Sequence, residues 1–352
     1  PGKMKTLSGA TVLVAGAGHI GSWFAGLCRG LGAHTVGLKR DVSRPVEGFD
    51  RLAVMEEMDF QPNALGRAFY LSRRKNKIGI LVAFREPDFQ QQIASGIEDG
   101  IVYARQHGIE IVTEIAPPDD DRGYLAALER LLSSDIQGLA LRGNGSEAAY
   151  DILRSLPENH IPIVAYNQDV PKNLRSCFVG QDSYRSGACA AYLMRQIAPA
   201  GGRILIVGVD WLHYSSEDRI RGFADRLRDC MEVSDVMYGK GSHELAYRLT
   251  RDKLRELPDL TGVFVSGAGL SGAAQAVEDT DLTGKVKVVG YDLTESNTRF
   301  LEKGTVQFLI DQGPYAQGYR SVQLLTDAVF QDKPVETELY DTGILIRCPY
   351  NC

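Results

Sequence analysis

The chain has 352 residues, of which 44% are hydrophobic, and its formal net charge at pH 7 is -6. This length allows two or three domains with a sizeable core, and the negative charge argues against a protein that coats nucleic acid over its whole surface. The six cysteines show no CxxC pair and no zinc-type spacing, and no apolar run approaches the roughly 20 residues that span a bilayer. We therefore expect a cytoplasmic protein with free thiols.

The first predicted unit is a strand, a glycine-rich turn, a helix and a second strand. A short apolar run predicts a buried strand at 11–15, and Gly16-Ala17-Gly18-His19-Ile20-Gly21 follows it directly. Residues 22–31 favour a helix and residues 34–38 a second strand. Such a turn lets backbone N–H groups approach a pyrophosphate at a helix N-terminus. This makes Gly16, Gly18 and Gly21 candidate cofactor-binding residues.

This unit, together with the preceding Leu7-Ser8-Gly9, resembles the cofactor-binding βαβ segment of D-2-hydroxyacid dehydrogenases. Lys39 and Arg40 stand where that family carries a ribose-binding acid, which favours NADP, with Arg40 at the 2′-phosphate. The resemblance covers only residues 5–45, whereas a dinucleotide fold needs two such halves. The alternatives are a segment whose glycines serve only close packing, or a chimeric N-terminus that folds poorly.

The next stretch, residues 51–76, predicts a hinge and a basic linker. Residues 51–60 indicate a helix, Pro62 suits the first turn of another, and residues 72–77 carry four positive charges and no acid. This order resembles the hinge of the lactose-repressor (LacI) family, in which a Pro-Asn-Ala-type helix joins a DNA-binding headpiece to a sugar-sensing core. By that resemblance, the hinge residues that would contact DNA are Pro62, Asn63, Ala64, Arg67 and Phe69.

DNA binding through this hinge is one of two interpretations. In the LacI family, paired hinge helices of a dimer enter the minor groove and wedge an apolar side chain between base steps, and Phe69 stands at that position. The family's helix-turn-helix headpiece is not recognisable in residues 1–50, which hold the Rossmann-like segment instead. The alternative is a basic linker without a function on DNA.

From residue 77 onward, apolar strands alternate with amphipathic helices. Strands are predicted at 78–83, 109–115, 136–141, 161–165, 203–207, 233–238, 262–265 and 286–290. A helix carries Ile93, Ile97 and Ile101 on one face and ends at Gly108, and others are predicted at 122–133, 145–156, 183–197, 217–230, 242–256 and 269–278. This alternation specifies parallel sheets joined by right-handed crossovers, and two such series in tandem indicate two lobes.

Several separated motifs in this region resemble the LacI-family core in the family's order. They are the lobe-crossing segment Val179–Gly187, the Arg-x-x-Gly-Phe signature beginning at Arg219, and the strand ends at Asp292 and Gln312. The resemblance implies an α/β, two-lobed type I periplasmic-binding-protein fold with two doubly wound parallel sheets. Lobe 1 would hold residues 77–181 with 313–341, and lobe 2 residues 182–312 with 342–352.

Polar residues at strand ends and helix starts form the candidate ligand site, because open α/β sheets bind ligands there. Amide and carboxylate side chains can pair with vicinal hydroxyls, an arginine offers a rigid fork of donors, and an aromatic ring can cover a sugar face. The candidate ligand-binding residues are Phe89, Asn167, Asp182, Arg219, Asp292 and Gln312, with Tyr184 or Trp211 as further aromatic candidates. Ser266-Gly267-Ala268-Gly269 stands where many relatives carry Asn-Asp, which leaves the sugar open.

These observations predict a LacI-family regulator-type protein that binds a small sugar or polyol effector between two lobes. The resemblance also implies a homodimer. We expect a protein that is not an enzyme, because the six histidines show no metal spacing and no Gly-x-Ser-x-Gly elbow is present. One alternative is an NADP-dependent oxidoreductase fragment or fusion that acts through the turn at 16–21. Another is a free-standing sugar-binding protein.

Overall fold

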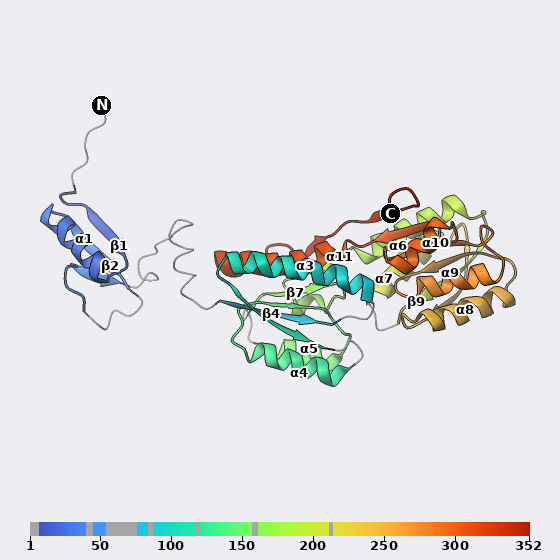
Figure 1. Cartoon of the computed structure of the whole chain (residues 1–352), viewed down its shortest axis with the longest axis horizontal. Coiled ribbons are helices and arrows are strands. Elements are labelled where there is room, and N and C mark those ends of the chain that lie inside the picture. The colour runs from blue at the N-terminus through green and yellow to red at the C-terminus, as the bar shows by residue number, and fades with distance from the viewer. Residues whose placement is uncertain are drawn as a thin grey trace, which may run out of the picture. The chain divides into compact units, whose positions relative to one another are not determined.

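The computed structural model describes residues 7–39, 45–53, 76–83, 87–116, 120–156, 161–210 and 214–352. Contacts divide the chain into two compact units, Pro1–Arg67 and Ala68–Cys352, and Figure 1 shows the elements of each. Within the described residues, no helix is both long and apolar enough to cross a membrane.

The first unit is a small parallel sheet with one helix. Its described elements are β1 (Thr11–Ala15), α1 (His19–Gly30), β2 (His34–Leu38) and β3 (Arg51–Ala53). The strand order is β1-β2-β3, and both pairings are parallel. The predicted strand–helix–strand order at 11–38 is therefore confirmed, with the helix starting three residues earlier than expected.

The third strand, β3, corrects the expectation of a helix over residues 51–60. Residues 51–53 pair with residues 36–38 of β2, and Ala53 is fully buried against Val36 and Leu38. The Asp50 carboxylate also accepts hydrogen bonds from the Thr35 backbone N–H at 2.7 Å and its hydroxyl at 3.0 Å. Tertiary pairing thus overrides the local helix pattern, and residues 54–60 lie outside the described part.

In the second unit, lobe 1 is a six-stranded parallel sheet with the order β14-β8-β7-β6-β4-β5. Its strands are β4 (Lys77–Val82), β5 (Glu110–Ile115), β6 (Leu139–Leu141), β7 (Ile163–Tyr166), β8 (Cys177–Gly180) and β14 (Leu339–Asp341). The helices α3 (Pro87–Gln106) and α11 (Pro314–Gln331) cover one face, and α4 (Asp121–Leu132) and α5 (Glu147–Arg154) cover the other (Figure 1). A 3-10 turn, η2 (Lys172–Leu174), precedes β8.

Lobe 2 repeats this arrangement with the order β10-β9-β11-β12-β13-β15. Its strands are β9 (Arg203–Gly208), β10 (Glu232–Tyr238), β11 (Leu260–Val265), β12 (Lys287–Tyr291), β13 (Phe308–Asp311) and β15 (Leu345–Arg347). Its helices are α6 (Ser183–Ile197) and α7 (Tyr214–Leu227) on one face, and α8 (His243–Glu256), α9 (Leu270–Asp279) and α10 (Glu295–Glu302) on the other. Only β15 runs antiparallel among these strand pairs. The two-lobed α/β fold with parallel sheets is confirmed.

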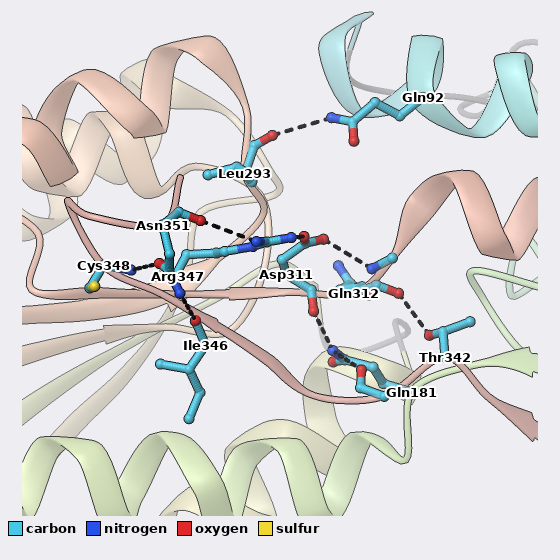
Figure 2. Close-up of polar contacts among 12 residues, drawn as sticks. Gln92, Gln181, Leu293, Asp311, Gln312, Thr342, Ile346, Arg347, Cys348 and Asn351 are labelled. Carbon is cyan, nitrogen blue, oxygen red and sulfur yellow. Dashed lines mark hydrogen bonds and ion pairs between the residues drawn. The ribbon is translucent and has the colours of Figure 1, made fainter.

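The chain crosses between the lobes after β8, after β13 and after β14, and these crossings are bonded to one another. Gln181 donates from Nε2 to the carbonyls of Asp311 at 2.8 Å and Gly343 at 2.9 Å. The Thr342 hydroxyl donates to the Gln312 carbonyl at 2.7 Å, and Arg347 of β15 pairs with Asp311 at 2.7 Å (Figure 2). These contacts set the position of Gln312, which follows β13 directly.

Helices α3 and α11 pack with their backbones in near contact. A Cβ atom at Gly96 would lie 2.1 Å from the Tyr315 carbonyl oxygen, and one at Gly318 would lie 2.2 Å from the Ile93 carbonyl oxygen. Only glycine permits this approach, because the obstructing atoms are main-chain atoms that no rotamer change can move. This close packing fixes the start of α3, which carries Phe89 toward the site.

Candidate functional site

A pocket lies between the carboxyl ends of the two sheets. Its space, including the part that is open to solvent, measures about 630 Å³. Its lining comes from the starts of α3 and α7 and from the residues that follow strands of both lobes. The lining residues are Phe89, Gln90, Ile93, Arg142, Asn167, Val209, Ser215, Ser216, Arg219, Ser266, Gly267, Ala268, Asp292 and Gln312.

On the side of lobe 2, the Gln312 carboxamide connects two charged groups. Arg219 donates from Nη2 to Gln312 Oε1 at 2.5 Å, and Gln312 Nε2 donates to Asp292 Oδ1 at 2.5 Å. Arg219 also donates to the Ser266 carbonyl at 3.0 Å, and its guanidinium carbon lies 4.0 Å from the centre of the Tyr291 ring. These contacts hold the guanidinium and the carboxylate in fixed orientations, as a preorganised site requires.

Burial raises the pKa of the Asp292 carboxyl from its usual 3.8 to about 6, although the Arg219 charge and the Gln312 hydrogen bond both lower it. The charge of Asp311 raises this pKa further. The backbone of Asp292 is left-handed, with φ of 74°, and Asn297 Nδ2 donates to its carbonyl at 2.9 Å. Asp292 therefore accepts hydrogen bonds as a carboxylate above pH 6 and can also donate as an acid below it.

On the side of lobe 1, Arg142 and Asn167 form the polar wall. Arg142 follows β6, has 6% of its surface exposed, and donates from Nε to Asn167 Oδ1 at 2.9 Å. The buried Tyr124 hydroxyl donates to the Arg142 carbonyl at 2.7 Å and anchors the main chain there. Sequence reasoning missed Arg142, although its position directly after the buried strand 139–141 is the signal that identified the other strand-end residues.

The remaining lining residues supply an apolar side and a pair of hydroxyls. Phe89 is half-buried and packs against the lobe-1 core. The Ser216 and Ser266 hydroxyls lie 2.6 Å apart, and Ser216 Oγ accepts the backbone N–H of Val209 at 3.1 Å. Ser266 thus contributes its carbonyl to Arg219 and its hydroxyl to Ser216.

Five of the six predicted ligand residues line this one pocket, and Asp182 does not. The Asp182 carboxylate instead accepts the Arg185 backbone N–H at 2.9 Å and caps α6, as an aspartate before a helix commonly does. Tyr184 is also absent from the lining, and its hydroxyl donates to Asp225 at 3.1 Å. Trp211 lies outside the described residues.

The glycine turn of the first unit has separate roles for its three glycines. Gly16 has a φ of 102°, and a Cβ at Gly21 would lie 2.0 Å from the Gly16 carbonyl oxygen, so Gly21 serves close packing of α1 on the turn. A Cβ at Gly18 would meet no atom within 4 Å, which leaves space beside the start of α1. Arg40 lies outside the described residues.

Two further predictions concern the hinge residues and metal binding. The hinge residues Pro62, Asn63, Ala64, Arg67 and Phe69 lie outside the described part of the chain. Among the described residues, no group of three or more His, Cys, Asp or Glu side chains could hold a metal ion.

The periplasmic binding protein domain model matches residues 78–333. A ribose operon repressor of Halalkalibacterium halodurans is 24% identical over 84% of this chain and 86% of its own length. A D-ribose/D-allose-binding protein of Pseudomonas aeruginosa is 26% identical over 64% of this chain and 75% of its own length.

Solved structures agree with the fold. An ABC transporter solute binding protein from Burkholderia graminis, in complex with D-arabinose, superposes with a TM-score of 0.71 at 20% identity and covers 78% of this chain and 96% of that one. GanP, a glucose-galactose binding protein from Geobacillus stearothermophilus, gives 0.71 at 20% identity, over 79% of this chain and 99% of that one. The prediction that the chain is not an enzyme agrees with these relatives, which carry the names of binding proteins and a repressor.

Proposed function

The chain belongs to the periplasmic binding protein domain family, and we propose that it binds a monosaccharide or polyol in the pocket between its two lobes. The observation that carries this proposal is the convergence of Phe89, Asn167, Arg219, Asp292 and Gln312 in one pocket, from segments far apart in the sequence. A pocket with one aromatic side and several planar polar groups suits the two faces of a sugar ring.

Each group has a distinct role in this proposal. Asp292 accepts sugar hydroxyls, and Arg219 donates to a hydroxyl or ring oxygen, while Gln312 keeps both in place. Asn167 approaches from lobe 1, and Phe89 covers the C–H face of the ring. Since the polar partners are already ordered, ligand binding costs little side-chain entropy.

The proposal includes closure of the lobes on the ligand. Lobe 1 and lobe 2 each contribute part of the lining, so a ligand that touches both sides favours the arrangement in which they are close. Gln92 of α3 already donates to the Leu293 carbonyl at 3.2 Å across the two lobes (Figure 2). This bond would be retained in a closed, ligand-bound arrangement.

The experiment is a thermal-shift screen of the full chain against pentoses, hexoses and polyols, followed by calorimetric titration of the best ligand. A ligand that binds only the native state raises the melting temperature. Replacing Arg219 or Asp292 by Ala should weaken binding by about 1–3 kcal/mol each, because the hydroxyls they contact lose a partner. Asp182→Ala is the matched control, since Asp182 caps α6 outside the pocket. Unchanged affinity in both site variants would place the ligand elsewhere.

A second candidate function is transcription regulation by a cytoplasmic homodimer. The match to the ribose operon repressor covers 84% of this chain, which is more than residues 77–352 account for, so it extends into the segment before the binding core. Basic residues there could contact phosphates, but a recognition helix is not identifiable in the sequence. The proposed DNA binding is therefore weak, non-specific and lost as salt rises.

Selection from random DNA duplexes separates the regulator from a free-standing binding protein. Enrichment of one palindromic site that survives at about 150 mM salt would establish a sequence-specific regulator. Retention of DNA only at low salt is the result expected for this chain. A complete lack of DNA binding at any salt would favour the free-standing binding protein.

A further inference from the structure

The helix α1 of the first unit carries a continuous apolar face that is open to solvent. Its members recur at the three- and four-residue spacing that places them on one side of a helix. They are Ile20, Trp23, Phe24 and Leu27, together with Leu31 at the C-cap, and their exposed fractions range from 47% to 85%. We call these five residues the α1 face. Ala25 and Cys28 on the opposite side of the helix are buried, so the first unit uses the other side of α1 for its own core.

The α1 face lies away from the β3 edge of the sheet. The helix α1 packs over β1 and β2 (Figure 1). Arg29 pairs at 3.2 Å with Asp50, which directly precedes β3, and so marks the β3 side of the helix. Leu27 and Leu31 each lie two residues from Arg29, which is about 200° around a helix. Because the strand order is β1-β2-β3, the α1 face is directed to solvent on the side of β1.

The strand β1 has an open edge on that same side. Among the described strands, β1 pairs only with β2, and an open edge of this kind is a template for pairing with another chain. The strand has five residues and the helix 12, which correspond to lengths of about 17 Å and 18 Å. The open edge and the α1 face therefore have matching lengths.

We propose that the α1 face and the open edge of β1 form an interface with a second copy of this chain. A two-fold axis perpendicular to the sheet pairs the two β1 strands antiparallel and brings the two α1 helices side by side on one face. The product is a six-stranded sheet with the order β3-β2-β1-β1-β2-β3. Each feature of one copy meets the same feature of the other, as in an isologous dimer. This proposal does not rest on the proposed sugar-binding function.

The size and charge of the α1 face favour a second copy as its partner. Large side chains can bury about 150–250 Å² each, so at the observed exposures the five residues offer on the order of 500 Å² of apolar surface. A stable interface buries about 800 Å² per partner, and pairing of β1 would add to the contribution of α1. The α1 face contains no charged side chain, so two identical faces meet without repulsion between like charges.

The test is sedimentation equilibrium of the full chain over a range of concentrations. The parent should form a species with twice the 38.6 kDa mass of one chain. Leu27→Glu should raise the dissociation constant about 100-fold or more, because each dimer would bury two like charges without a partner. Val102→Glu is the matched control, since Val102 is an apolar residue of α3 in lobe 1 that is also about half exposed. It should keep the dissociation constant of the parent.

Two measurements on chains with an unchanged α1 locate the interface. The chain has two tryptophans, Trp23 and Trp211, so Trp211→Phe leaves the fluorescence of Trp23 alone. This emission should shift to shorter wavelength as rising concentration moves Trp23 from water into the interface. Hydrogen exchange of residues 11–15 should slow over the same concentrations, because N–H groups of β1 gain partners. Both measurements stay valid if Leu27→Glu does not fold.

The outcomes have separate meanings. A dimer that is weakened in Leu27→Glu, is kept in Val102→Glu and shows both concentration-dependent signals supports the proposal. A parent chain that stays monomeric at concentrations on the order of 100 μM overturns it, and the α1 face then has another partner. A dimer that is lost in Val102→Glu and kept in Leu27→Glu places the interface on lobe 1 and also overturns it. A dimer in which exchange of residues 11–15 is unchanged overturns the pairing of β1.

Discussion

Asn167 and Asp292 occupy equivalent positions in the two lobes, and both have left-handed backbones, with φ of 62° and 74°. Each follows a fully buried tyrosine at the end of a strand, Tyr166 in β7 and Tyr291 in β12. Asparagine and aspartate adopt this conformation more readily than other residues with a side chain. The turn that ends each strand therefore places a short polar side chain in the pocket lining of each lobe.

The first prediction concerns the pH dependence of stability at Asp292. Its pKa is raised to about 6 in the folded protein from a usual 3.8, so the folded state favours the protonated acid. The stabilisation is fully present below pH 3.8 and is lost as the pH rises through about 6. The Asp292→Asn variant cannot ionise at this position, so it does not lose stability in this way, and it tolerates the same backbone. Its free energy of unfolding, relative to that of the parent, should therefore rise with pH by up to about 3 kcal/mol.

Urea denaturation of both proteins between pH 4 and pH 7.5 measures this difference. A constant offset between Asp292→Asn and the parent over that range would show that Asp292 titrates with an ordinary pKa. The slope of the urea dependence should stay the same, since the substitution does not alter the surface exposed on unfolding.

The second prediction separates two contributions of Asn167 to stability, that of its side-chain amide and that of its left-handed backbone. Asn167→Ala and Asn167→Gly both remove the acceptor of the Arg142 Nε hydrogen bond. Alanine is strained at a φ of 62°, whereas glycine is not. The glycine variant should therefore be more stable than the alanine variant by about 1 kcal/mol, as measured by thermal or urea unfolding. An alanine variant as stable as the glycine one would contradict the left-handed backbone.

The third prediction is that Gln312 stabilises the charged pair at the pocket. Gln312→Met keeps the length of the side chain but removes both hydrogen bonds, to Arg219 and to Asp292. The expected cost in unfolding free energy is about 1–3 kcal/mol, because two buried polar groups lose a partner. The pKa of Asp292 should rise further, since the Gln312 hydrogen bond lowers it.

The control for this substitution is Gln331→Met at the exposed end of α11, which should stay within about 0.5 kcal/mol of the parent. Equal stabilities of Gln312→Met and Gln331→Met would indicate that the bonds through Gln312 contribute nothing net.

The fourth prediction concerns the contact of α3 with α11. Gly318→Ala places a Cβ 2.2 Å from the Ile93 carbonyl oxygen and 2.9 Å from the Ile97 backbone nitrogen. Alanine favours helix by about 1 kcal/mol over glycine, yet the overpacking should destabilise the protein by about 1–3 kcal/mol. Ser95→Ala at an exposed position of α3 is the control and should be neutral or slightly stabilising. A stabilised Gly318→Ala variant would mean that the two backbones are further apart.

The sequence by itself determined the α/β class of residues 77–352 and most of the polar set at the pocket. Runs such as 204–208 and 262–265 are continuously apolar because their strands are covered on both faces, so the pattern identifies them without tertiary information. Asn167 and Asp292 follow such runs directly, Gln312 follows one after Asp311, and the carboxyl ends of parallel strands share one edge of a sheet. Local pattern and topology together were sufficient for these residues.

Other features depended on contacts that no local pattern contains. The helix α11 meets α3 at the close backbone contact of Gly318, which no apolar period marks, and the three-residue strands β14 and β15 are too short for a periodic signal. The helix expected at 51–60 begins as a strand because β2 offers it hydrogen bonds, and Asp182 caps α6 rather than lining the pocket.

The tertiary structure alone placed Arg142 opposite Arg219 across the pocket. Arg142 follows the short strand β6 of lobe 1, and Arg219 lies within α7 of lobe 2, so sequence spacing does not relate them. Their shared position arises because the two sheets direct their carboxyl ends toward one another, which brings residues from both lobes to one pocket.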